Sequence, residues 1–94
     1  MARKSIPFEA FLVCIGDNIR RVRTGKGYTL DELGHDIGLD KSNLHHIEQG
    51  KNITVLTLLK IAAFLEVTPA SLLESDITIT AEEAEQYIKG KKKA

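Results

Sequence analysis

The chain has 94 residues, 43% of them hydrophobic and 28% charged, which is the composition of a single globular domain. One cysteine, Cys14, excludes an internal disulfide, and no apolar stretch approaches the roughly 20 residues that a membrane-spanning helix needs. The formal net charge is zero, but residues 1–26 have six Lys or Arg and two Asp or Glu, whereas residues 27–50 have one and five. A basic N-terminal segment therefore precedes an acidic middle.

Residues 7–24 are predicted to form an amphipathic helix. Six apolar side chains recur there at helical spacing and form one face. They are Phe8, Phe11, Leu12, Ile15, Ile19 and Val22. Gly25 and Gly27 end this helix.

Two short helices are expected next, at residues 29–36 and 41–49. Thr29 and Glu32 have the spacing of a capping box, in which each side chain binds the other residue's backbone N–H. Gly38 stops the first helix, and Asp40 is a good N-cap for the second. Two short helices joined by a tight turn are typical of a helix-turn-helix.

A fourth helix is predicted at residues 54–66 and a fifth at 68–73, where Pro69 takes the first helical position. In the fourth helix, one side is expected to face the core. Its residues are Val55, Leu58, Leu59, Ala62 and Leu65. Leu56, Ile61 and Phe64 lie on its other faces, so this helix is apolar nearly all round.

Residues 76–94 are expected to be a C-terminal extension. Residues 76–80 alternate like a short strand, and a second capping box from Thr80 to Glu83 opens a polar helix to about Lys89. The basic end of the chain is expected to be disordered.

Residues 16–74 resemble the lambda-repressor-like helix-turn-helix domains of phage Cro and repressor proteins and of many small bacterial regulators. The shared motifs are I-R-x-x-R, T-L-x-E-L, I-E-x-G, T-L-L-K-I-A and V-T-P-x-x-L-L, in this order. Each motif alone is weak, whereas the ordered set is specific. The resemblance implies an all-α, five-helix DNA-binding domain in residues 1–75, with its helix-turn-helix at 29–49 and its second helix in the major groove.

On a helical wheel of residues 41–49, Leu44 and Ile47 define the buried side, and polar side chains lie opposite them. The resemblance implies that Lys41, Ser42 and His46 read bases. The full set of candidate DNA-contacting residues is Lys41, Ser42, Asn43, His45, His46, Gln49, Arg20, Arg21 and Thr29. The alternative for these residues is an ordinary solvated helix face.

Metal binding and catalysis have little support in the sequence. His45 and His46 are adjacent, so they diverge by about 100° on a helix, whereas structural zinc needs four converging ligands. No motif typical of a hydrolase, a phosphate-binding loop or a metalloprotease occurs. We therefore expect no catalytic residue, no metal and no cofactor.

Two further contacts are expected. Arg23 and Glu48 both lie near apolar helix faces, and the resemblance pairs them as a partly buried, bidentate ion pair. The apolar helix at 54–66 indicates burial on more than one side. We expect a two-fold dimer contact formed by Leu56, Phe64, Ile77 and Ile79. The alternative is that other parts of the same chain cover these side chains.

The sequence thus predicts a homodimeric, sequence-specific DNA-binding transcriptional regulator, of repressor type, that reads a pseudo-palindromic operator. It is expected to be cytoplasmic in a bacterium or phage-encoded, to bind the nucleoid, and to have no membrane contact. The alternative is a protein-interaction or antitoxin-like module on the same fold, with secondary DNA binding. The acidic middle segment and the apolar helix at 54–66 favour this alternative, in which a protein is the partner.

Overall fold

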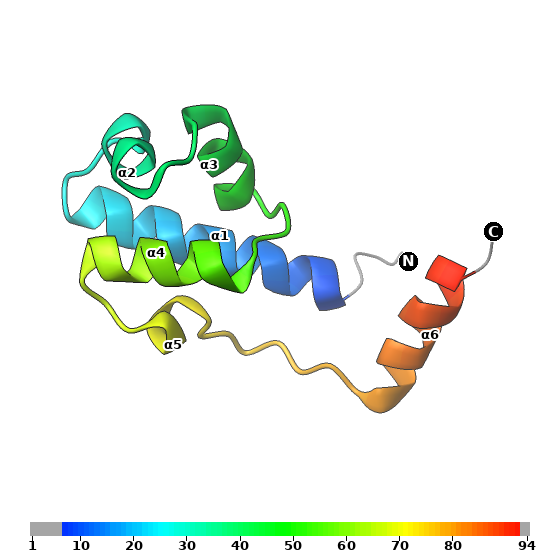
Figure 1. Cartoon of the computed structure of the whole chain (residues 1–94). Helices are drawn as coiled ribbons and strands as arrows, with labels where there is room; N and C mark the ends of the chain where they lie inside the picture. Colours follow the sequence, from blue (N-terminus) through cyan, green and yellow to red (C-terminus); the bar gives the residue numbers. More distant parts are fainter. Residues whose placement is uncertain (1–6, 93–94) are drawn as a thin grey trace.

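The structure is a computed structural model that describes residues 7–92, with side chains for 8–89. Its helices are α1 (Pro7–Gly25), α2 (Leu30–Ile37), α3 (Lys41–Glu48), α4 (Val55–Leu65), α5 (Pro69–Leu72) and α6 (Ala81–Lys92). Figure 1 shows α2 and α3 on one side of α1 and α4, and α5 on the other side. An extended segment separates α6 from this body (Figure 1). The described residues are therefore all-α.

Helix α1 buries one face along its length, because its apolar residues recur at helical spacing. Ile15 and Ile19 are buried in the core, and three further apolar side chains of α1 pack against it. These three are Phe11, Leu12 and Val22. Within residues 7–92, no helix combines the length and the hydropathy that crossing a bilayer requires.

Helices α2 and α3 begin and end where the capping signals predict. The Glu32 N–H donates to Thr29 Oγ1 at 3.0 Å, and the Thr29 N–H donates to Glu32 Oε1 at 2.8 Å, so the capping box is complete. Gly38, at φ 75°, ends α2 in the left-handed region that favours glycine. Asp40 Oδ1 accepts from the Asn43 N–H at 2.8 Å and caps α3.

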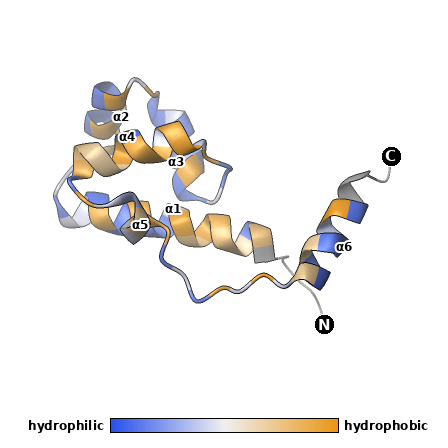
Figure 2. Cartoon of the chain, turned by 60° about the horizontal axis from the view of Figure 1, so that its bottom comes forward, coloured by the Kyte–Doolittle hydropathy of each residue, from blue (hydrophilic) through white to orange (hydrophobic). Residues whose placement is uncertain are grey.

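The expected core face of α4 is wrong by part of a turn. Leu58, Ala62 and Leu65 are buried as predicted, but Ile61 takes the remaining core position. Val55 is 71% exposed and Leu59 45% exposed. The buried side of α4 is set by its neighbours. Because α4 packs against α2, α5 and α1, the side that carries Ile61 is buried. Figure 2 shows hydrophobic residues along most of the length of α4, so the pattern of this helix alone cannot select the buried side.

The predicted strand at 76–80 is also wrong. Among residues 7–92 there is no strand, because a strand requires a hydrogen-bonded neighbour and this segment runs alone between α5 and α6. The second capping box is present, since the Glu83 N–H donates to Thr80 Oγ1 at 3.1 Å. Helix α6 continues to Lys92, three residues beyond the expected end, and an edge-to-face contact of Phe8 with Tyr87 links it to α1. Part of the expected disordered end, residues 93–94, lies outside the described residues.

Helix α1 approaches α3 closely enough to exclude a side chain at Gly16. A Cβ atom built there would lie 2.4 Å from the Ile47 carbonyl oxygen and 2.6 Å from that of Glu48. We therefore expect Gly16→Ala to push α3 away from α1 and to lower the free energy of unfolding by about 1–3 kcal/mol. Urea unfolding followed by circular dichroism measures this loss.

The matched control is Gly25→Ala at the end of α1, where a Cβ would meet nothing within 4 Å. The free energy of unfolding of this variant should lie within about 0.5 kcal/mol of the wild-type value or slightly above it. Equal stabilities of the two variants would contradict the close approach.

Candidate nucleic-acid interface

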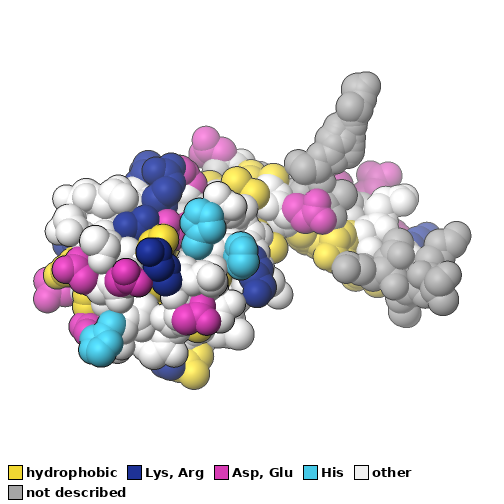
Figure 3. Space-filling model, turned by 90° about the horizontal axis from the view of Figure 1, so that it is seen from above, with side chains coloured by type: hydrophobic (Ala, Val, Ile, Leu, Met, Phe, Trp, Pro, Cys, Tyr) yellow, Lys and Arg dark blue, Asp and Glu magenta, His cyan; other side chains and the backbone are white. Residues whose placement is uncertain are grey.

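The outward side of α3 presents five polar side chains on one exposed surface. Leu44 and Ile47 are buried, as the helical wheel predicts, and they fix the opposite side toward solvent. The exposed residues are Lys41, Ser42, His45, His46 and Gln49. Figure 3, which views the molecule from the side of α2 and α3, shows basic and histidine side chains on this face with carboxylates among them.

Two other candidate residues lie at the margins of this surface. Asn43 is only partly exposed and lines a crevice with residues of the α3–α4 loop, such as Ile53 and Thr54, so it turns away from the outward set. Thr29 is exposed at the start of α2, and its hydroxyl oxygen is engaged by the capping box.

The buried pair of Arg23 and Glu48 holds α3 against α1. Arg23 Nε donates to Glu48 Oε2 at 2.6 Å, and Nη2 donates to Oε1 at 2.9 Å, so the pair is bidentate as expected. The side chains are 10% and 4% exposed. The hydrogen bonds to Glu48 raise the pKa of Arg23, against the opposing effect of burial. Arg23 Nη1 also donates to the Tyr28 carbonyl at 2.8 Å, so the same side chain binds the turn between α1 and α2.

Arg20 and Arg21 are exposed, and both bind the carboxylate of Asp17 one turn earlier on α1. Hydrogen bonds from Arg21 and then Arg20 hold the pKa of Asp17 below its ordinary value. The two arginines differ in position. Arg20 lines a hollow of about 360 Å³ together with His45, Glu48 and Gln49 of the α3 region, whereas Arg21 donates to Asn18 on the side of α5. Arg20 is therefore the closer of the two to the outward side of α3.

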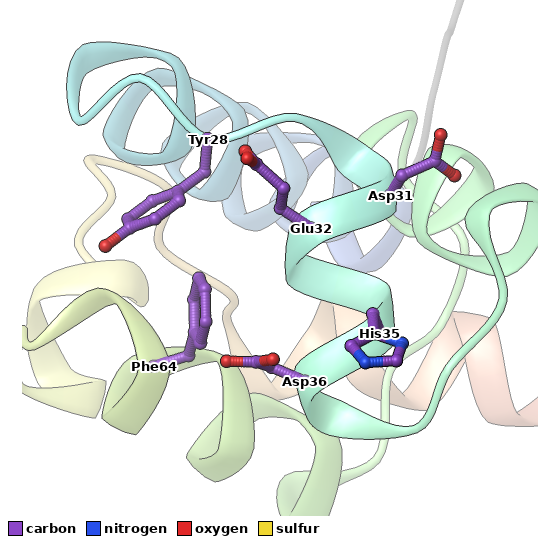
Figure 4. Close-up of a pocket in the computed structure, with 6 residues that line it drawn as sticks. All are labelled: Tyr28, Asp31, Glu32, His35, Asp36 and Phe64. Atoms are coloured by element: carbon purple, nitrogen blue, oxygen red, sulfur yellow. The ribbon is translucent and has the colours of Figure 1, made fainter.

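Carboxylates also lie close to this surface. Lys41 Nζ lies 3.8 Å from Asp31 Oδ2. This ion pair joins α3 to α2, and because it is exposed it contributes little to the stability of the fold. Beyond it, an open pocket of about 500 Å³ lies between α2 and α4 (Figure 4). Three carboxylates and a histidine line it, with two aromatic rings, namely Asp31, Glu32, Asp36, His35, Tyr28 and Phe64. The rings of Tyr28 and Phe64 lie 4.7 Å apart. These acidic side chains suit a polyanion poorly.

The sequence reasoning missed Asn18, a buried polar residue that positions the end of α5. Its Nδ2 donates to the Leu72 carbonyl at 3.0 Å and to the Glu74 carbonyl at 2.9 Å. A signal for this role exists, because Asn18 interrupts the apolar face between Ile15 and Val22, and a polar side chain there needs a partner.

The expected dimer residues are in different environments. Leu56 is 62% exposed and Ile79 is also exposed, whereas Ile77 is partly buried. Phe64 is partly buried and packs against Tyr28 and the core. The large exposed apolar residues of α4 are Val55, Leu56 and Leu59. Among residues 7–92, no group of three or more His, Cys, Asp or Glu side chains is arranged to hold a metal ion.

Comparison with known proteins identifies the class to which this fold and surface belong. A family model described as "Helix-turn-helix" matches residues 19–72. The chain therefore belongs to the helix-turn-helix family, in its lambda-repressor-like branch.

The chain is similar to the HTH-type transcriptional regulator SinR of Bacillus subtilis (strain 168), with 39% identity over 62 residues. This match covers 64% of the chain and 56% of SinR, so the chain spans little more than half the length of that relative. The restriction-modification controller protein C.AhdI from Aeromonas hydrophila has a similar structure, with a TM-score of 0.65 and 36% identity over 67% of this chain and 97% of that one. SinR in complex with DNA matches with a TM-score of 0.60 and 39% identity over 64% of this chain and 98% of that one.

The ion pair of Arg23 and Glu48 makes a clear prediction for stability. Glu48→Gln keeps the size of the side chain but leaves the Arg23 charge buried without an anion, so it should lower the free energy of unfolding by about 3 kcal/mol. Urea unfolding at neutral pH measures the effect.

Glu85→Gln is the matched control, because Glu85 forms an exposed ion pair with Lys89 at 3.2 Å on α6. Its effect should stay within about 0.5 kcal/mol. If both variants lose equally little stability, the buried pair does not hold α3 in place.

Proposed function

We propose that this protein is a sequence-specific DNA-binding regulator of transcription that inserts α3 into the major groove. The observation that carries the proposal is the outward row of polar side chains on α3, held at a fixed orientation by the pair of Arg23 and Glu48. Side chains of this length and hydrogen-bonding capacity suit base edges. The match to SinR, whose structure in complex with DNA shares this fold, supports the same role here.

Within α3, we assign base contacts to the N-terminal end and to the next turn. Lys41 can donate to the N7 and O6 atoms of guanine, and Ser42 can donate to or accept from several bases. His46 lies one turn after Ser42 on the same side, so it can reach the next base or a phosphate. Arg20, beside His45 and Gln49, is placed to contact the DNA backbone.

The regulator is proposed to act as a homodimer of repressor type. Two copies of α3 in successive major grooves would read an imperfect palindrome with half-sites about one helical turn apart. We assign the two-fold contact to the large exposed apolar residues of α4, which are Val55, Leu56 and Leu59. Such a regulator would act in the cytoplasm of a bacterium, on chromosomal or phage DNA.

The DNA-reading assignment predicts two different kinds of loss. Binding is measured on DNA selected from a random pool. Ser42→Ala and His46→Ala should each make the free energy of binding to this DNA less favourable by about 1–3 kcal/mol. Their affinity for scrambled DNA should stay unchanged. Arg20→Ala should instead weaken binding to both DNAs and make the slope of log K against log salt shallower by about 0.9.

The control for the histidine is His35→Ala on α2, which removes an exposed imidazole outside the outward row of α3. It should keep the preference for the selected DNA. If Ser42→Ala and His46→Ala bind the selected DNA as well as wild type does, α3 is not the reading element, and a protein-interaction module becomes the better assignment.

The dimer assignment is tested by sedimentation. Leu56→Lys places a charge in the exposed apolar surface of α4 and should convert the dimer to a monomer at micromolar concentration, because a charge buried without a partner is costly. Ile88→Lys, at a 52% exposed position on α6, should leave the dimer intact. The assignment would be wrong if wild type sediments as a monomer, or if only the α6 variant dissociates.

A further inference from the structure

The carboxylate of Asp17 lies between two arginines on the exposed side of α1. Its Oδ1 accepts from Arg20 Nη2, and its Oδ2 accepts from Arg21 Nε at 3.0 Å. All three side chains are exposed to solvent by about half. Such pairs one turn apart are common on helix surfaces and contribute little to stability, so the ion pairs themselves do not explain why two cations share one anion here.

The two arginines are held differently. Arg21 has a second acceptor, the side-chain oxygen of Asn18, and Asn18 is itself fixed by the carbonyls of Leu72 and Glu74. For Arg20, the ion pair with Asp17 is the single hydrogen bond or ion pair of the side chain within the described residues. Arg20 is therefore the arginine that can be released when another anion takes the place of Asp17.

Arg20 also lies beside the surface that the proposed function assigns to DNA. The hollow that it lines, with His45 and Gln49, adjoins the outward surface of α3. The fourth residue of the hollow, Glu48, is already neutralised by Arg23. The remaining polar groups are hydrogen-bond donors or neutral side chains, so a phosphate oxygen meets no unpaired carboxylate inside the hollow.

We propose that Asp17 competes with DNA phosphate for Arg20 and so lowers the affinity of this protein for DNA of any sequence. In the free protein, Asp17 binds the Arg20 guanidinium, and DNA binding exchanges this carboxylate for a phosphate. This proposal rests on the proposed function, because it assigns a control element to the same DNA-binding surface. Since phosphate contacts are independent of sequence, the competition lowers specific and non-specific binding by the same factor and does not change which bases α3 prefers.

The test is DNA binding by Asp17→Asn, which removes the charge and keeps the size of the side chain. Affinity should rise about two- to fivefold at low salt, the range expected for an exposed ion pair. The gain should be equal on selected and scrambled DNA, and the slope of log K against log salt should steepen by up to about 0.9. Asp76→Asn, an exposed carboxylate in the segment between α5 and α6, makes the same change of net charge and should gain less than half as much.

A double-mutant cycle separates competition from simple repulsion between Asp17 and DNA. In the Arg20→Ala background, Asp17→Asn should raise the affinity no more than Asp76→Asn does, because the guanidinium that DNA would take over is gone and the remaining partner of Asp17, Arg21, is also held by Asn18. The proposal is overturned if Asp17→Asn gains no more than Asp76→Asn, or if its gain persists without Arg20. Wild-type protein that binds neither DNA would instead refute the proposed function, so the two failures are distinguishable.

Discussion

The buried ion pair of Arg23 and Glu48 is the contact on which the geometry of the candidate interface depends. Helix α3 has only eight residues, and its apolar contacts come mainly from Leu44 and Ile47. Apolar contacts are not directional, so two of them leave a short helix able to turn about its axis. The two hydrogen bonds of the guanidinium to the carboxylate remove that freedom, and the third bond of Arg23, to Tyr28, joins the α1–α2 turn to the same point. Gly16 lets the two backbones come close enough for this pair to form.

Much of this arrangement could be predicted from the sequence, because the signals that define it are local. The capping residues Thr29, Asp40, Thr54 and Thr68 each accept from a backbone N–H three residues later, and the sequence identifies Thr29 and Asp40 as caps. The outward set of α3 follows from its buried residues by helical geometry alone. The pair of Arg23 and Glu48 needed more, namely the resemblance to a family in which these two positions meet.

The features that sequence reasoning missed depend on how elements meet in space. The buried side of α4 is set by its neighbours, and its apolar pattern is too continuous to distinguish Ile61 from Leu59. The alternation at 76–80 has the period of a strand, but the chain supplies no neighbouring strand among the described residues. Asn18 could have been noticed as a polar residue on an apolar face, yet its acceptors lie more than 50 residues further along the chain. In each case a distant part of the chain decided the outcome.

In α3, the residues that hold the helix in the fold differ from those that face solvent, and this has a consequence for how such proteins diversify. Leu44, Ile47 and Glu48 hold the helix in place, whereas Ser42 and His46 make no side-chain hydrogen bond or ion pair with other described residues that would hold the fold together. Substitutions at the outward positions can therefore accumulate during evolution without a loss of folding. Under the proposed function, duplicated copies would then acquire different target sites on an unchanged scaffold. The same property makes this helix a suitable acceptor for grafted recognition residues.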